Sequence, residues 1–149
     1  MAEYNEAFMK AALEMAAEAF DDGEVPVGAV IVRNGEIVST GRNRREKSKN
    51  ALMHAEIDAI NNACAALGGW RLWNCELYVT LEPCPMCAGA IINAHIPQVY
   101  FGAYDHKNGC CGTVASLFEM PFTYKPKCEG GFLQEDCSAL LTGFFKKLR

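Results

Sequence analysis

The sequence predicts a three-layer α/β/α domain with a mostly parallel central sheet. Helical and strand patterns alternate along the chain, as expected when helices cover both faces of such a sheet. The clearest example is the strand–helix–strand pattern over residues 76–102, which is typical of a right-handed crossover. With 149 residues, half of them hydrophobic, the chain suits one globular domain, and we expect residues 1–149 to form it.

The N-terminal elements are a helix and a β-hairpin. Apolar residues recur at helical spacing over residues 4–19, and Gly23 is expected to close this helix. A nearly unbroken apolar strand follows at 27–32. The Asn-Gly pair at 34–35 is the dipeptide that a two-residue hairpin turn prefers, so we expect a return strand at 37–41.

The later elements alternate between helix and strand. An apolar stripe over residues 57–67 predicts a helix, and two glycines at 68–69 end it. The elements expected after it are a strand at 76–81, a helix at 85–94, a strand at 98–102, a short helix around 113–119, a strand near 124–129 and a last helix over 133–148.

Two short motifs point to metal chemistry. His54 and Glu56 flank Ala55, and Cys84 and Cys87 form a C-x-x-C pair directly after a strand. One imidazole and two thiolates make three zinc ligands and leave a fourth tetrahedral position for water, which marks a catalytic site. Glu56, two residues after His54, is expected to lie close enough to exchange protons with the water molecule bound to the metal. The combination matches the known signature of the zinc nucleobase deaminases.

Both motifs are expected at helix N-termini. In mid-helix, residues i and i+2 point about 200° apart, so His54 and Glu56 can serve one site only at the mouth of a helix. We expect Asn50 to be the N-cap, with His54 in the first turn. Cys84 and Cys87, at i and i+3, share a face of their own first turn. The positive ends of the two helices then favour thiolate over thiol.

The cysteines allow other interpretations. A C-x-x-C pair alone is also typical of a redox pair or of half a structural zinc site. The chain has no second C-x-x-C, which disfavours a zinc ribbon. The isolated cysteines are interpreted as small buried apolar residues: Cys64, Cys75, Cys128 and Cys137. Cys110 and Cys111 lie in a glycine-flanked loop and are assigned a structural or substrate-wall role.

The charge distribution limits the class of partner. A net charge of −4 and a pI near 5.4 argue against a general nucleic-acid binder. Positive charge is nevertheless concentrated in two segments, and we expect six cations to contact a phosphate backbone: Arg42, Arg44, Arg45, Lys47, Lys146 and Lys147. The acidic N-terminus is not a signal peptide, and no apolar run approaches the roughly 20 residues that span a bilayer. We therefore expect a cytoplasmic protein with no membrane contact.

Five segments, in order along nearly the whole chain, carry a family resemblance: EVPVGAV at 24–30, HAEI at 54–57, YVTLEPCPMCAGA at 78–90, GAYDHKNG at 102–109 and CSALLTGFFK at 137–146. Together they resemble the bacterial tRNA adenosine deaminases. The resemblance implies a cytidine-deaminase-like fold with a five-stranded mixed sheet, one Zn²⁺ per subunit and a homodimer. It also implies hydrolytic conversion of adenosine to inosine at the wobble position of a tRNA anticodon stem-loop.

The resemblance also implies individual roles. His54, Cys84 and Cys87 match the zinc ligands, and Glu56 matches the proton shuttle. Asn43 matches an asparagine that hydrogen-bonds the target nucleotide. A side-chain amide suits this role because it can both donate hydrogen bonds to a base edge and accept them from it. The other expected substrate contacts line the base pocket or the loop beside it: Val27, Ala55, Glu82, Pro83 and Asp105.

Besides the zinc ribbon, the chain allows two alternatives to this function. The main one is a deaminase of a free nucleobase or nucleoside, of the guanine or cytosine type, on the same fold. The basic run at 42–49 argues against it, because a small neutral base gains nothing from that much charge. A catalytically silent nucleic-acid-binding subunit would not need Glu56 and both cysteines. The chain departs from the family pattern at 51–53 and 123–124, and neither departure changes a metal ligand or Glu56.

Overall fold

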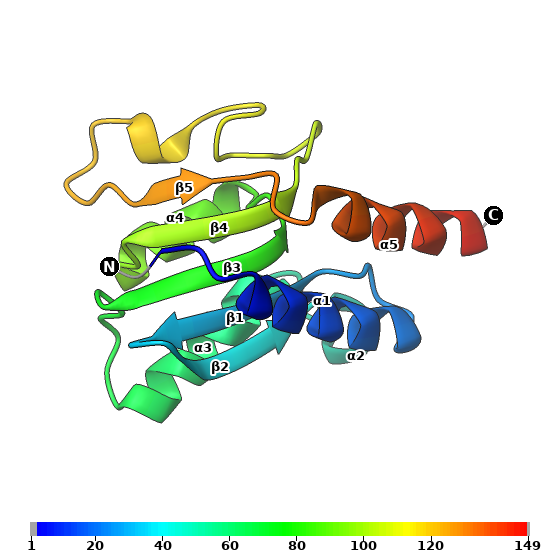
Figure 1. Cartoon of the computed structure of the whole chain (residues 1–149), viewed down its shortest axis with the longest axis horizontal. Helices are drawn as coiled ribbons and strands as arrows, with labels where there is room; N and C mark the ends of the chain where they lie inside the picture. Colours follow the sequence, from blue (N-terminus) through cyan, green and yellow to red (C-terminus); the bar gives the residue numbers. More distant parts are fainter. Residues whose placement is uncertain (1–2, 149) are drawn as a thin grey trace.

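The computed structural model describes residues 3–148, which form a five-stranded sheet in the order β2-β1-β3-β4-β5 with helices on both faces (Figure 1). In chain order the elements are α1 (Glu6–Asp21), β1 (Gly28–Arg33), β2 (Glu36–Arg42), α2 (Arg45–Ser48), α3 (Ala55–Leu67), β3 (Cys75–Leu81), α4 (Pro85–Ala94), β4 (Gln98–Ala103), the 3₁₀ turn η1 (Leu117–Glu119), β5 (Lys127–Glu129) and α5 (Gln134–Lys147). The expected α/β fold with a five-stranded mixed sheet is confirmed.

Strand β1 is central to the topology of the sheet. It lies between β2 and β3 and runs antiparallel to both, whereas β3, β4 and β5 are parallel to one another. The hairpin reverses the chain at Asn34 and Gly35, which both have positive φ as a primed turn requires. Because β2 and β3 both oppose β1, they run in the same direction, and α3 crosses over β1 between them.

The side chains of β1 alternate between two cores. Ala29 and Ile31 face the layer of α3 and α4, whereas Val30 and Val32 face α1 and contact the cluster around Met9. Helix α5 packs on the α1 side, against α1 and β4. The sequence of a strand that is buried on both faces is a continuous run of apolar residues, without alternation between apolar and polar residues. This explains the unbroken apolar run at 27–32.

Two of the sequence expectations need correction. His54 itself is the N-cap of α3, and the Asn50 side chain instead accepts a hydrogen bond from the Leu52 N–H in the preceding turn. The helix expected around 113–119 is only the 3₁₀ turn η1, because the loop before it is held by hydrogen bonds to other parts of the chain. The short helix α2 was not expected. No helix within residues 3–148 is long and apolar enough to cross a membrane.

Gly41 sets the distance between β2 and the start of α3. A Cβ atom at Gly41 would lie 2.4 Å from both the Ala55 carbonyl oxygen and the Ala59 nitrogen. These are backbone atoms, which cannot rotate away as a side chain can. The first turn of α3 therefore rests directly on the strand backbone, and any side chain at this position would push the helix off the sheet.

We predict that Gly41→Ala lowers the free energy of unfolding by about 1–3 kcal/mol, the usual effect of overpacking a close contact. Denaturant unfolding measures this change. Gly69→Ala is the matched control, because nothing lies within 4 Å of a Cβ at Gly69. Equal stability of the two variants would contradict the close packing of α3 on β2.

Candidate active site

The metal motifs meet because α3 and α4 begin at the same edge of the sheet. His54 and Cys84 are the N-caps of these helices, and both have extended backbone, with φ −73° and ψ 162° at His54 and φ −77° and ψ 174° at Cys84. Neither side chain caps its own helix, so both are free to face the site. Pro85 occupies the first helical turn, where a missing N–H is tolerated.

The three expected ligands are close enough to share one metal ion. His54 Nδ1 lies 3.6 Å from Cys84 Sγ and 3.5 Å from Cys87 Sγ. Zn–N and Zn–S bonds of about 2.0 and 2.3 Å at the tetrahedral angle place the two ligand atoms about 3.5 Å apart. The ligand atoms of all three residues lie within 4.8 Å of one another. The donor set and its spacing therefore fit a zinc ion.

The electrostatics of the motif favour metal binding. Hydrogen bonds to its sulfur from Cys87, and then from His54, lower the pKa of Cys84 to about 4, although burial opposes this shift. Cys84 is therefore a thiolate at neutral pH, the form that binds zinc. Two helix N-termini, each with unpaired N–H groups, add positive potential at the same point.

Glu56 lies in the first turn of α3 and is buried, with 4% of its surface exposed. Burial raises the pKa of Glu56 to about 7, although the nearby His54 opposes this rise. Its side chain is hydrogen-bonded to Cys87, so the carboxyl group lies beside the metal motif. A carboxyl group with a pKa near neutrality can both accept and donate protons, as an acid–base catalyst must.

A cavity of about 200 Å³ opens beside these groups. This volume is below the range of about 300–1,000 Å³ that is usual for drug-sized ligands, so the cavity suits a single planar ring. Its lining residues come from five segments of the chain: Val25, Val27, Asn43, Arg45, His54, Ala55, Glu56, Leu81 and Asn108.

Asn43 is held in place by the pocket's own backbone. Its side-chain nitrogen donates to the Val25 carbonyl at 3.2 Å, and its side-chain oxygen accepts from the Arg45 N–H at 3.3 Å. A primary amide has two donor hydrogens and two acceptor lone pairs, so one of each is left for a ligand. Val27 and Ala55, which were also expected to contact substrate, line the same cavity.

Glu82 and Pro83, which were expected as pocket walls, are not among the lining residues of this cavity, and Leu81 forms the wall there. The buried Glu82 carboxylate instead binds the loop after β4. It accepts hydrogen bonds from the backbone N–H groups of Asp105, Cys111 and Thr113, and from the Thr113 hydroxyl. The Pro83 carbonyl accepts from the Cys110 N–H. These residues shape the loop that carries Asn108 into the pocket.

Asp105 has a similar local role. Its carboxylate accepts hydrogen bonds from the backbone N–H groups of Lys107 and Asn108 at 3.0 and 3.1 Å, which makes a tight turn. This turn sets the position of Asn108, a lining residue that was not among the expected contacts. A possible signal for it was its place in a loop after a parallel strand, since ligands bind outside the carboxyl ends of such strands.

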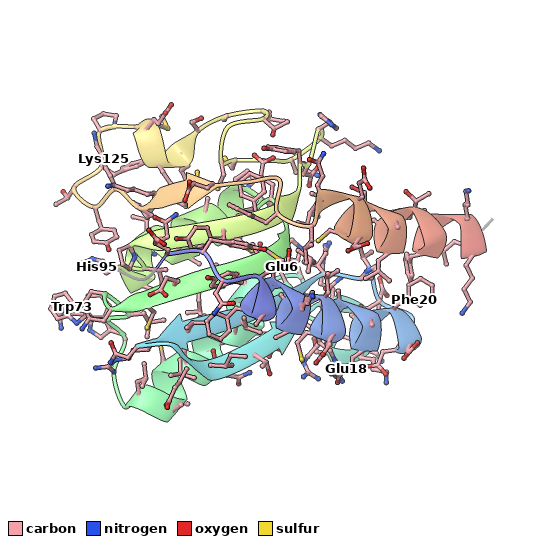
Figure 2. All side chains as sticks on the ribbon, in the orientation of Figure 1. Glu6, Glu18, Phe20, Trp73, His95 and Lys125 are labelled. Carbon is pink, nitrogen blue, oxygen red and sulfur yellow. The ribbon has the colours of Figure 1, made fainter. Side chains whose placement is uncertain are left out.

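The expected phosphate-binding cations divide into two groups. Three of them form ion pairs. Arg42 pairs with Glu18 at 2.5 Å and with Asp22 at 3.0 Å. Arg44 pairs with Asp58 at 2.9 Å, and Lys47 pairs with Asp22 at 3.1 Å. Figure 2 labels Glu18 on α1, which supplies the acid for Arg42. Within residues 3–148, no ion pair involves Arg45, Lys146 or Lys147.

A second cavity, of about 440 Å³, shares the lining residues Val25, Asn43 and Arg45 with the pocket. Its other lining residues include two acidic residues of the N-terminal half and two apolar residues of the C-terminal segment: Glu24, Glu46, Phe144 and Leu148. Lys146 and Lys147 lie on the same turn of α5 as Phe144. Arg45, which has no ion pair within residues 3–148, thus lines both cavities.

Comparisons with known proteins agree with this site. Residues 2–103 match a family model described as the cytidine and deoxycytidylate deaminase zinc-binding region. The tRNA-specific adenosine deaminase of Bacillus subtilis (strain 168) is 47% identical over 146 residues, which cover 97% of this chain and 91% of that protein.

Solved structures are similar to the chain as well. A structure from a study of A-to-I editing by tRNA:A34 deaminases at the wobble position of transfer RNA has a TM-score of 0.89 and 39% identity, and the match covers 92% of this chain and 100% of that one. A guanine deaminase from Bacillus subtilis is 41% identical, with a TM-score of 0.65, over 68% of this chain and 66% of that one.

We predict that Cys87→Ser loses most of its bound zinc, because serine does not supply the thiolate that the tetrahedral set needs. Metal analysis of the purified protein measures the zinc content per chain. Cys110→Ser, which alters a neighbouring buried thiol outside the ligand cluster, is expected to keep one zinc. Full occupancy in Cys87→Ser, with zinc moved to Cys110 or Cys111, would refute the ligand assignment.

Proposed function

The chain belongs to the cytidine and deoxycytidylate deaminase zinc-binding family, and on this premise we propose that it hydrolytically deaminates adenosine to inosine at the wobble position of a tRNA. The observation that carries the proposal is the likeness to tRNA-specific adenosine deaminases over nearly the full length of both chains. A guanine deaminase from Bacillus subtilis matches only about two thirds of each chain, and the guanine deaminase from Nitrosomonas europaea, which matches 97% of this chain, is only 24% identical and so shares the fold alone. The resemblance drawn from the sequence motifs is thereby confirmed.

The shape and charge of the site support a polynucleotide over a free base. The pocket has room for one base, and a second cavity that shares three of its lining residues lies beside it. Arg45 lines both cavities. A free neutral base has no group that would use this cation, whereas the phosphates flanking a flipped nucleotide would.

We assign a role to each residue on this basis. His54, Cys84 and Cys87 would hold a zinc ion, which would supply a Lewis acid that makes water nucleophilic near neutral pH. Glu56 would accept the first proton of the attacking water and pass it to the ring nitrogen, and would then transfer the proton of the added hydroxyl group to the leaving amine, so that water and adenosine give inosine and ammonia.

The remaining lining residues hold the base. Asn43 would use its free donor and acceptor on the base edge. The Ala55 N–H, at the start of α3, would donate to the developing negative charge on the ring. Val25, Val27 and Leu81 supply apolar walls that exclude water from the reacting carbon.

The same proposal extends to partners and compartment. The substrate element would be the anticodon stem-loop, whose loop nucleotides are already partly unpaired, so that flipping one out costs only a few kcal/mol. The protein would act in the cytoplasm, in keeping with eight cysteines of which none forms a disulfide within residues 3–148.

A homodimer is the proposed assembly. Support for it comes from large apolar side chains that the monomer exposes, among them Leu52, Val114, Met120 and Phe122, which are 46–59% exposed. Symmetric pairing is the commonest way to cover such surface.

We predict that Glu56→Ala keeps zinc and fold but loses turnover by about 10²- to 10⁴-fold, the usual effect of removing a general acid–base group. Single-turnover deamination of an anticodon stem-loop RNA, with inosine as the readout, measures the rate. Zinc content and melting temperature are the controls. A rate comparable to that of the unmodified protein would place the proton shuttle elsewhere.

We predict that Arg45→Ala weakens stem-loop binding and makes the log–log dependence of affinity on salt shallower by about 0.7, the value for one lost contact to a single strand. Lys47→Ala is the matched control, because Lys47 already pairs with Asp22. An equal effect of the two variants would contradict the assignment of Arg45 to a phosphate.

The substrate class is tested by comparing the deamination of a stem-loop RNA with that of free bases. We expect inosine in the stem-loop RNA, and poor turnover of free adenine, guanine and cytosine, because contacts remote from the base supply the binding energy that positions it. Efficient, salt-independent deamination of free guanine with no inosine formed in tRNA would favour the free-base alternative.

We predict that light scattering at micromolar concentration gives the mass of two chains. Leu52→Glu, which places a charge at a side chain that is 58% exposed in the monomer, is expected to shift the equilibrium towards one chain. A monomer mass for the unmodified protein would refute the dimer.

A further inference from the structure

Cys111 and Cys128 meet although they lie on different segments of the chain. Cys111 belongs to the loop after β4, and Cys128 is the middle residue of the edge strand β5. The Cys128 sulfur lies 3.5 Å from the Cys111 carbonyl oxygen, and the two thiol groups are hydrogen-bonded to each other. Figure 1 shows this loop segment passing over the β5 edge of the sheet.

The pair is accessible from solvent. Both side chains are half-buried, whereas Cys75, Cys87, Cys110 and Cys137 are fully buried. Cys128 lines an open cavity of about 540 Å³ between β5 and η1, together with Phe118, Glu119 and Lys127. Cys128 therefore lies at a surface that a small solute can enter. Cys64, which is also half-buried, contacts the Trp70 carbonyl, and no hydrogen bond to another thiol is found for it within residues 3–148.

The two thiols are not equivalent. The hydrogen bond from Cys111 lowers the pKa of Cys128, and the same hydrogen bond raises the pKa of Cys111, with burial adding to the rise. The thiolate is the nucleophile in disulfide chemistry. Cys128 also lines the open cavity, whereas Cys111 is not among its lining residues, so Cys128 is assigned as the attacking residue.

We propose that Cys111 and Cys128 are a reversible dithiol–disulfide pair that tethers the loop at 109–117 to strand β5. The oxidant is a low-molecular-weight disulfide. The Cys128 sulfur attacks it, its S–S bond breaks, and one small thiol leaves. The Cys111 sulfur then attacks the mixed disulfide and displaces the second small thiol. The two protein thiols are oxidised, the small disulfide is reduced to two thiols, and the two protons leave with them.

The consequence of the bridge follows from what else holds this loop. The Cys111 N–H donates to the Glu82 carboxylate at 3.0 Å, and the Cys110 N–H donates to the Pro83 carbonyl at 2.8 Å. Both acceptors immediately precede Cys84. A covalent link to β5 would fix the opposite side of the same loop, so that it is anchored both to the turn after β3 and to the sheet edge.

The zinc-loaded protein is equilibrated with oxidised glutathione, alkylated and analysed by intact mass and peptide mapping. We expect the loss of two hydrogens, a single cross-linked peptide joining Cys111 to Cys128, full reversal by dithiothreitol and unchanged zinc content. We also expect amide hydrogen exchange at residues 109–117 to slow in the oxidised protein. Free thiols at both positions, a bridge between other cysteines or unchanged exchange would overturn the proposal.

Two variants test the order of attack. Cys111→Ser keeps a hydrogen-bond donor beside Cys128 but removes the second thiol, so it should retain glutathione on Cys128 as a stable mixed disulfide. Cys128→Ser should leave Cys111 unmodified. Cys64→Ser, the matched half-buried cysteine without a thiol partner, should form the bridge as the unmodified protein does. Glutathione trapped equally on both single thiols would overturn the assigned order.

Discussion

The site depends on one topological constraint, the common direction of β2 and β3. The chain passes from β2, through the short helix α2, to α3, whose N-cap is His54, and from β3 directly to α4, whose N-cap is Cys84. Because both strands oppose β1, their carboxyl ends lie at the same edge of the sheet. The two helix N-termini therefore converge there. Had the hairpin been absent, the two motifs would lie at opposite edges and could not share a metal ion.

Close backbone packing fixes the positions of the site residues within this topology. Gly41 lets the first turn of α3 rest on the backbone of β2, which sets the height of His54 and Glu56 over the sheet. On the other side of the pocket, the buried Glu82 carboxylate gathers the N–H groups of the loop after β4. Gly109 leaves the space for this carboxylate, since a Cβ there would lie 2.5 Å from it. The loop thus packs against the turn that carries Cys84.

Ion pairs decide which cations the site can use. The basic run at 42–49 faces the acidic end of α1, and Glu18, Asp22 and Asp58 neutralise three of its members. These pairs also attach the run to the body of the protein. Arg45 is held at the pocket mouth by its backbone hydrogen bond to Asn43 while its guanidinium has no acidic partner within residues 3–148. An acidic protein can in this way present a localised positive charge to a nucleic acid.

The sequence by itself determined the identity of the elements and of the metal motif. Periodicity, the Asn-Gly turn and helix-ending glycines act within a few residues, so the bounds of α4 and the end of α3 at Leu67 agree with expectation. Only the tertiary structure decided which polar residues face the pocket. Glu82 looked like a substrate contact, yet its carboxylate accepts hydrogen bonds from the N–H groups of Asp105, Cys111 and Thr113, which are distant in the sequence. Likewise, the pairing of Cys111 with Cys128 depends on how the loop after β4 packs against the edge of the sheet. Local sequence patterns do not predict such a long-range contact.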